Sequence, residues 1–367
     1  MTKNISPELQ RWIDVMLERN ASDLILTENQ PPILRLVGDL EPLKERVLNT
    51  DEVKRFAYSL LTPEQQKTFE QTLEMDSSFG LEGRARFRVN VFQQRGAVGV
   101  AIRALPHEIP TLESLGVPDI VKEWLMIPHG IIITTGPTGS GKSTTQAGMI
   151  GLLNQNKHYH VVTIEDPIEF THPNGTCTIE QREVGRDTHS FADALKHVFR
   201  QTPDVIMVGE MRDKETFETA LQLAETGHLV LATLHTGDAT QAINRIVDVF
   251  PAEQQQQIRV QLSFTLIGIL VQQLVPTLDG EGRMLATEIL EANPAVRSLI
   301  RRGDLQQIYS MIQTGSSDGM ITMNGCLLRL FKEGKISLEQ AMLFTTRQKE
   351  LEQLVARERG FAQHAKI

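Results

Sequence analysis

The octapeptide GPTGSGKS at residues 136–143 constrains this chain more than any other feature, because it directly follows the apolar run 130–135. It fits the pattern G-x-x-x-x-G-K-[ST], in which a strand leads through a glycine-rich loop into a helix. Small residues let several backbone N–H groups point at phosphate oxygens, and the helix that follows offers its positive N-terminus to the same anion. The sequence therefore predicts a phosphate-binding loop in an α/β domain.

The loop gives each of its residues an expected task. Lys142 should reach the β- and γ-phosphates, and the hydroxyl of Ser143 should hold Mg²⁺. A glycine-rich turn beside a surface lysine is the alternative, and the strand before the loop and the helical pattern after it argue against that alternative. The residues expected to bind the nucleotide are Gly136, Pro137, Thr138, Gly139, Ser140, Gly141, Lys142, Ser143 and Thr144.

Two acidic segments follow apolar runs that are predicted strands. The segment EDPIE ends in Glu169 and follows the run 160–164, while the run 205–208 leads into Gly209 and Glu210. Open α/β sheets bind their ligands at the carboxyl ends of the strands, so both acids are candidates for one nucleotide site. Glu165 and Glu169 could instead be solvated loop acids.

Two histidines flank the predicted strand 229–233. His228 lies in the segment TGH just before this strand, and His235 follows it. A lone histidine is more often structural than functional, which applies to His228 more than to His235. Because polar groups in four segments agree with a single site at one end of the sheet, we expect both histidines to belong to it.

The chain as a whole is predicted to contain two domains. Residues 1–105 read as a small α+β domain, the proline-containing segment 106–118 reads as a linker, and residues 119–367 read as an α/β domain that becomes mainly helical from about residue 293. The expected strands are 23–27, 33–37, 84–92 with a returning strand near 98–102, 130–135, 160–164, 205–208 and 229–233, and the expected helices begin after Ser6 and Ser190.

Composition limits the class of protein. The formal net charge is −9 and the charged fraction is 23%, and no basic stripe stands out, so a nucleic acid is not the expected partner. Only Cys177 and Cys326 are present, which excludes a paired-cysteine zinc module. Neither a signal peptide nor an apolar run of about 20 residues is recognisable, so a cytoplasmic location is expected.

Five segments together resemble a known family. GPTGSGKST, IEDPIEF, QREVGRDT, VGEMRD and TGHLVLATLHT are similar to the Walker A, aspartate box, Walker B and histidine box segments of the type II/type IV secretion ATPases. Within that superfamily, the chain looks most like the PilT/PilU-type retraction ATPases of type IV pili. The resemblance covers nearly the whole chain, including SDLILTENQPPILRLVG near the start.

The resemblance implies a PAS-like N-terminal domain, a RecA-like P-loop ATPase domain and a homohexameric ring that uses ATP and Mg²⁺. By position, Glu169 would be the general base, Glu210 would act on Mg²⁺, and His228 and His235 would sense the γ-phosphate. Arginines of the N-terminal domain approach the phosphates in this family. Arg88 and Arg103 are the candidates here, because Arg86, Arg88 and Arg103 can share the polar side of one hairpin; a solvated strand face is the alternative.

Two features favour retraction over assembly of the pilus. Only 141 residues precede Lys142, and no cysteine pair is present, whereas assembly enzymes usually carry a longer N-terminal region and often a four-cysteine module. The segment AVRSLIRR resembles the AIRxLIRE motif of retraction enzymes, but it departs at Val296 and at Arg302, where an acid is usual. An ordinary amphipathic surface helix is the alternative for this segment.

The expected function is therefore a motor for pilus retraction and twitching motility, peripheral at the inner membrane through a platform protein. A paralogous retraction ATPase is a further candidate partner. The alternatives left open are a PilU-like accessory motor, a pilus or secretion assembly ATPase, and a nucleotide-regulated scaffold with little hydrolysis. A nucleic-acid translocase is disfavoured by the acidic charge.

Overall fold

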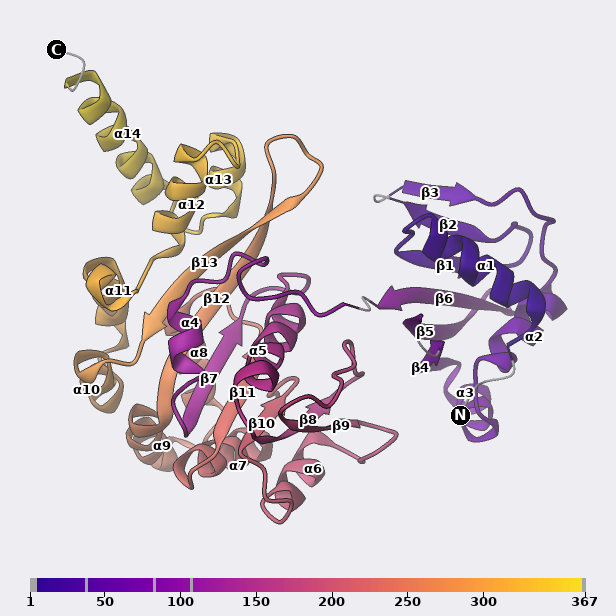
Figure 1. Cartoon of the computed structure of the whole chain (residues 1–367), viewed down its shortest axis with the longest axis horizontal. Coiled ribbons are helices and arrows are strands. Elements are labelled where there is room, and N and C mark those ends of the chain that lie inside the picture. The colour runs from indigo at the N-terminus through magenta and orange to yellow at the C-terminus, as the bar shows by residue number, and fades with distance from the viewer. Residues whose placement is uncertain (1–4, 37–38, 82–83, 106–107, 365–367) are drawn as a thin grey trace. The chain divides into compact units, whose positions relative to one another are not determined.

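The computed structural model describes residues 5–36, 39–81, 84–105 and 108–364, and the side chains up to residue 358. The chain forms two compact units, residues 1–108 with 169–171, and residues 109–168 with 172–367 (Figure 1). The break at residue 108 falls inside the predicted linker, although Leu112 and Val117 are buried in the core of the second unit. Two units with mixed helices and sheets confirm the predicted fold class.

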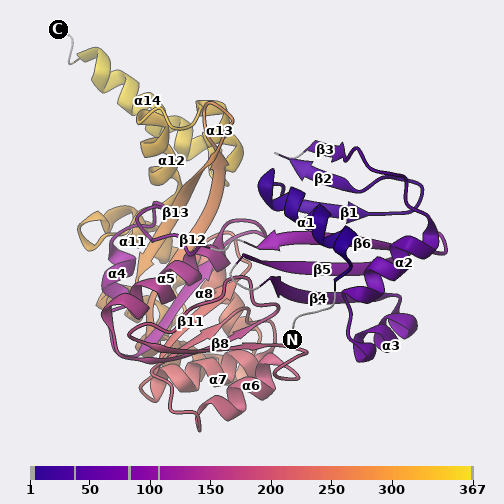
Figure 2. The same cartoon turned by 45° about the vertical axis from the view of Figure 1, so that its right-hand side comes forward.

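The first unit is built on an antiparallel sheet with the strand order β3-β2-β1-β6-β5-β4 (Figure 2). Its strands are β1 (Asp23–Leu26), β2 (Ile33–Leu36), β3 (Asp39–Pro42), β4 (Glu74–Leu81), β5 (Ala85–Gln94) and β6 (Ala97–Leu105), and its helices are α1 (Pro7–Glu18), α2 (Thr50–Ser59) and α3 (Pro63–Thr72). Helix α1 begins where the sequence predicts, because the Ser6 hydroxyl accepts from the Leu9 N–H and Pro7 occupies the first turn.

The hairpin β5–β6 carries the arginines that were predicted to share one polar face. Along β5, Phe87, Val89 and Val91 are buried, and the residues between them are not. Arg88 lies directly opposite Arg103 in the register of the two strands. Residues two apart on a strand face the same side, so Arg86 joins this pair. The predicted common face is confirmed.

The second unit is built on a sheet with the strand order β13-β12-β7-β11-β10-β8-β9. All neighbouring strands are parallel except the pair β12–β13. The strands are β7 (Gly130–Thr135), β8 (His160–Glu165), β9 (Thr178–Glu183), β10 (Val205–Val208), β11 (Leu229–Leu234), β12 (Leu266–Pro276) and β13 (Arg283–Glu291). Every residue of β7, β10 and β11 is buried, as expected for parallel strands covered on both faces.

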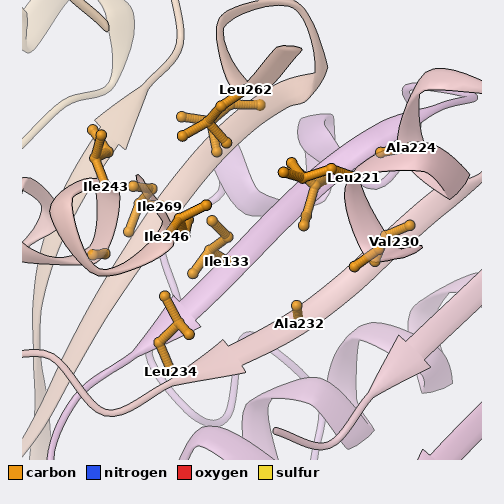
Figure 3. Close-up of a cluster of buried hydrophobic side chains, with 14 of the residues drawn as sticks. Ile133, Leu221, Ala224, Val230, Ala232, Leu234, Ile243, Ile246, Leu262 and Ile269 are labelled. Carbon is orange, nitrogen blue, oxygen red and sulfur yellow. The ribbon is translucent and has the colours of Figure 1, made fainter. Parts of the chain in front are cut away.

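Helices cover this sheet and close its core. They are α4 (Ile120–Trp124), α5 (Lys142–Asn156), α6 (Phe191–Val198), α7 (Lys214–Glu225), α8 (Ala239–Asp248) and α9 (Ala252–Thr265). Figure 3 shows Leu221 of α7, Ile246 of α8 and Leu262 of α9 gathered over Ile133 of β7 and Ile269 of β12. The phosphate-loop strand β7 is therefore held rigidly at the centre of the unit.

The last part of the chain is helical and packs on the hairpin β12–β13. It contains α10 (Pro294–Arg302), α11 (Ile308–Thr314), α12 (Met323–Lys332), α13 (Leu338–Phe344) and α14 (Gln348–His364). Val275 and Ala286 of the hairpin share a core with Cys326 and Leu327 of α12. Cys326 is fully buried and Cys177 is 2% exposed. Among the described residues, no helix is both long and apolar enough to cross a membrane.

Candidate nucleotide site

The predicted phosphate loop lies between the end of β7 and the start of α5, and its glycines are required by geometry. Gly136 has a φ of 149°, and a Cβ there would stand 2.2 Å from the carbonyl oxygen of Gln272 on β12. Gly139 and Gly141 have φ values of 79° and 87°, in the left-handed region that favours glycine. The loop thus closes tightly against β12, and the backbone conformation is of the kind that concentrates N–H groups around an anion.

The polar side chains of the loop lie at the N-terminus of α5. Lys142 is 8% exposed, and its ammonium donates to the carbonyl oxygens of Gly136, at 2.8 Å, and of Pro137, at 3.0 Å. Ser143, one residue further along, is exposed. The buried Ser140 hydroxyl has no hydrogen-bond partner among the described residues, and a phosphate oxygen would provide one. These groups fit a nucleotide phosphate.

Glu210 lies in a turn that hydrogen bonds fix on both sides. The N–H of Gly209 donates to the Ile164 carbonyl at the end of β8, and the N–H of Met211 donates to the Thr233 carbonyl in β11. The carboxylate accepts from the Arg212 guanidinium at 2.6 Å. Glu210 thus stands at the carboxyl end of the sheet, as predicted.

The neighbours of Glu210 keep it ionised. The hydrogen bond from Arg212 lowers the pKa of Glu210, and the charge of His235, whose Nε2 lies 3.4 Å from Oε1, lowers it further. An ionised carboxylate and an exposed hydroxyl are oxygen ligands of the type that Mg²⁺ prefers, so Glu210 and Ser143 fit that ion. The described residues contain no group of three or more histidine, cysteine or acidic side chains able to hold a metal alone.

His235 belongs to a turn that is fastened to the phosphate loop. The hydroxyl of Thr135, the last residue of β7, donates to the Thr236 carbonyl at 3.0 Å. The Thr135 hydroxyl oxygen also accepts from the Thr236 N–H at 2.9 Å. His235 contacts Glu210 on the other side. The structure therefore brings together the phosphate loop, Glu210 and His235.

His228 does not join this group, and the expectation that it lies at the same end of the sheet as His235 is wrong; its role at the γ-phosphate remains a prediction. It precedes β11, and its carbonyl accepts from the N–H of Gly130, the first residue of β7. The phosphate loop follows the last residue of β7, so the two lie at opposite ends of a six-residue strand, about 20 Å apart. The His228 Nδ1 lies 3.0 Å from the Leu223 carbonyl, where it completes the C-terminal end of α7.

Glu165 and Glu183, the last residues of β8 and β9, are both buried and lie opposite each other in the sheet. Glu165 accepts from the hydroxyl of Thr163 at 2.7 Å and from the amide of Gln181 at 3.0 Å. Gln181 also accepts from the His172 N–H at 2.8 Å, and Glu183 accepts from the Ile168 N–H at 3.2 Å. Two β9 side chains therefore hold the residues that flank 169–171 on either side.

The roles of Gln181 and Glu183 were not predicted from the sequence, where these residues stood out only as part of the motif QREVGRDT. Glu169 falls within the stretch 169–171 that groups with the first unit. Its position at the phosphates remains a prediction.

Arg88 and Arg103 belong to the first unit, and their approach to the phosphates also remains a prediction. Arg103 pairs with Asp23 at 2.8 Å, and Arg88 lies 3.7 Å from Asp76. The Arg103 side chain is 65% exposed and that of Arg88 is 41% exposed. Both guanidinium groups thus keep donors for a further anion, because one carboxylate does not use all five N–H groups.

Comparison with known proteins decides the family. The sequence profile described as "Type II/IV secretion system protein" matches residues 2–366. The chain belongs to this family. Its relatives include the type IV pilus retraction ATPase PilT of Pseudomonas aeruginosa, 46% identical over 88% of this chain and 94% of PilT, and the type IV pilus ATPase PilU of the same organism, 40% identical over 91% of this chain and 88% of PilU. A crystal structure of the pilus retraction motor PilT with bound ADP matches at 50% identity with a TM-score of 0.88, covering 94% of this chain and 98% of that one.

Proposed function

We propose that this member of the type II/IV secretion family is an ATP-hydrolysing motor that powers retraction of a type IV pilus. The observation that carries the proposal is the phosphate loop joined to Glu210 and His235, in a chain that is 46% identical to a pilus retraction ATPase over nearly its whole length. The ADP bound in the PilT crystal structure supports nucleotide binding by this chain.

Each side chain of the site has a task in hydrolysis. Lys142 and the loop amides neutralise and orient the phosphates, and Ser143 and Glu210 would hold Mg²⁺, which supplies charge neutralisation when it is bound. Glu169 would orient the attacking water. Arg88 and Arg103 would complete the charge around the phosphates when the domains close. Positioning and electrostatics suffice for this reaction, since phosphoryl transfer to water needs no covalent intermediate.

The mechanical part of the proposal requires an assembly. A homohexameric ring bound to an inner-membrane platform protein would convert each closing and opening of the two domains into movement of the pilus. The identity with PilU supports a closely related alternative, an accessory motor that assists a stronger paralogue. An assembly ATPase and a nucleotide-regulated scaffold are the other candidates. An assembly ATPase predicts cells without pili when the gene is absent, and a scaffold predicts little ATP hydrolysis.

The first test counts surface pili on cells that lack the gene, complemented with wild type, with Lys142→Ala or with Lys67→Ala. Lys67 is an exposed lysine on α3 and is the matched control. Excess pili that never shorten, rescued by wild type and by Lys67→Ala but not by Lys142→Ala, are the expected result. Bald cells would show an assembly motor instead. An unchanged pilus count would overturn retraction as the primary function.

A further inference from the structure

Glu288 of β13 is a buried carboxylate that joins the first turns of two helices. The residue is 3% exposed. One carboxylate oxygen accepts from the N–H of Ala239 at 3.0 Å, and the other accepts from the N–H of Met323 at 3.5 Å. Ala239 is the first residue of α8 and Met323 is the first residue of α12. Both bonds use backbone donors that have no partner within their own helix.

The buried surroundings of Glu288 disfavour the ionised form of its carboxyl group. Burial raises the pKa of Glu288, and the negative charge of nearby Asp238 raises it further, while the bond from Ala239 lowers it. Buried charges are unfavourable unless hydrogen bonds or opposite partial charges compensate them. The N-terminal ends of α8 and α12 carry partial positive charge and provide that compensation. The carboxylate is therefore stabilised only while both helices begin beside it.

On one side, Glu288 is connected to the nucleotide site. Helix α8 follows directly after the turn that contains His235 and Thr236. Thr236 bonds to Thr135 at the start of the phosphate loop, and His235 contacts Glu210. The turn is thus held at both ends: Thr236 is bonded to the phosphate loop, and the Ala239 N–H donates to Glu288.

On the other side, Glu288 is connected to the C-terminal helices. The side-chain amide of Asn324, the second residue of α12, donates to the Arg347 carbonyl at 3.2 Å. The Arg347 guanidinium lies 3.7 Å from the ring centre of Tyr309 on α11, and the Tyr309 hydroxyl donates to Glu350 of α14 at 2.7 Å. Helices α11, α12 and α14 thus form one polar junction next to Glu288.

We propose that Glu288 is a positioning residue that holds the His235 turn in place and links it to α12. Nucleotide binding at the phosphate loop then changes the stability of the first turn of α12. The effect passes through the hydrogen bonds that join Thr135 to Thr236 and Ala239 to Glu288. The effect on catalysis rests on the proposed ATPase function, whereas the link itself concerns nucleotide binding alone.

The variant Glu288→Gln tests the link without deleting side-chain volume. The amide retains one oxygen that can accept from Ala239, but its NH₂ group then faces the N–H of Met323, and two donors cannot pair. Glu291→Gln is the control, because Glu291 is a partly buried acid of the same strand on the opposite face. A thermal unfolding scan on both variants confirms that they are folded.

Amide hydrogen exchange with and without ADP is the decisive measurement. In wild type and in Glu291→Gln, ADP should slow exchange both in the peptide with the His235 turn and in the peptide with the first turn of α12. In Glu288→Gln, the first protection should remain and the second should be lost. ADP protection of α12 that persists in Glu288→Gln, or that is absent in wild type, would overturn the link.

Steady-state hydrolysis of ATP tests the positioning role. We expect Glu288→Gln to lower kcat by about tenfold while ADP affinity stays within about twofold, because a displaced catalytic turn costs rate rather than binding. In a double-mutant cycle, Glu288→Gln should add little to His235→Ala. Additive losses would refute action through His235. A wild-type protein without turnover would instead refute the ATPase proposal, and the exchange experiment would still decide the link.

Discussion

The carboxylates of this site differ in how firmly their surroundings hold them. Glu165 and Glu183 are buried and receive hydrogen bonds from neighbouring groups, whereas Glu210 stands at the open end of the sheet with its pKa lowered by Arg212. Buried acids that accept hydrogen bonds from their neighbours suit structural tasks. The acids expected to take part in chemistry are therefore Glu210 and Glu169.

Glu169→Gln should preserve nucleotide binding and reduce turnover by a factor of about 10²–10⁴, because an amide of the same shape cannot accept a proton from water. Binding of a fluorescent ATP analogue and release of inorganic phosphate measure the two effects separately. Glu180→Gln, an exposed acid of β9, should change neither. Full turnover in Glu169→Gln would remove this residue from the role of base.

At this scale the sequence predicted some residues well and missed others. The phosphate loop could be predicted because its glycines and Lys142 form a contiguous pattern with one physical meaning. His228 was misplaced because it is close to His235 in the sequence, although the strand between them puts the two histidines at opposite ends of the sheet. Gln181 and Glu183 were missed because their role depends on side chains that reach across to another loop, which residue spacing does not reveal.

Among the elements, α10 has an internal task that its sequence does not show. The Arg297 guanidinium donates to the carbonyl oxygens of Ser263 and Phe264, at 2.7 and 2.8 Å, and to that of Ala292, at 2.6 Å. The first two carbonyls belong to the last turn of α9, which lacks intrahelical donors there. An arginine in the segment that resembles the AIRxLIRE motif thus completes a helix end.

Arg297→Met should therefore destabilise the second unit by about 1–3 kcal/mol, since the carbonyls lose a charged donor, and should leave nucleotide affinity unchanged. Urea unfolding monitored by far-UV circular dichroism measures the loss. Arg302→Met is the control, because the exposed pair of Arg302 with Asp304 contributes little. Equal stability of Arg297→Met and wild type would show that Arg297 is not needed as a cap.

The elements that the sequence predicted correctly were those with a clear pattern of apolar residues. Strands β5, β7, β10 and β11 were predicted closely, because their residues alternate or are continuously apolar. Strands β4 and β9 were missed: the polar sequence TIEQRE of β9 has no apolar face of its own, and it is held at the sheet edge by pairing with β8. The hairpin β12–β13 was not predicted, because its antiparallel pairing is a tertiary property.

For the whole molecule, His172 predicts a loss of stability in acid. Burial lowers the pKa of His172 from 6.5 to about 4. Between these values the unfolded chain binds a proton that the folded chain does not, so stability falls as pH drops from 6.5 towards 4. The side chain is 7% exposed, and the expected loss is about 2–3 kcal/mol.

Urea unfolding at pH 6.5 and pH 4 checks this, with Trp124 fluorescence as the signal in a Trp12→Phe background, because the two tryptophans lie in different units. His172→Leu should lose about 2–3 kcal/mol less over this range than the parent protein, and the exposed His158→Gln should behave like the parent. Identical pH dependence of His172→Leu and the parent would contradict the prediction.

The two buried thiols have a practical consequence for a machine whose units are expected to open and close. Because Cys177 and Cys326 are both within the second unit and shielded from solvent, maleimide dyes can be directed to new cysteines placed on the surface of each unit. Energy transfer between such a pair would follow the interdomain distance in single molecules during turnover, with the native residues left in place.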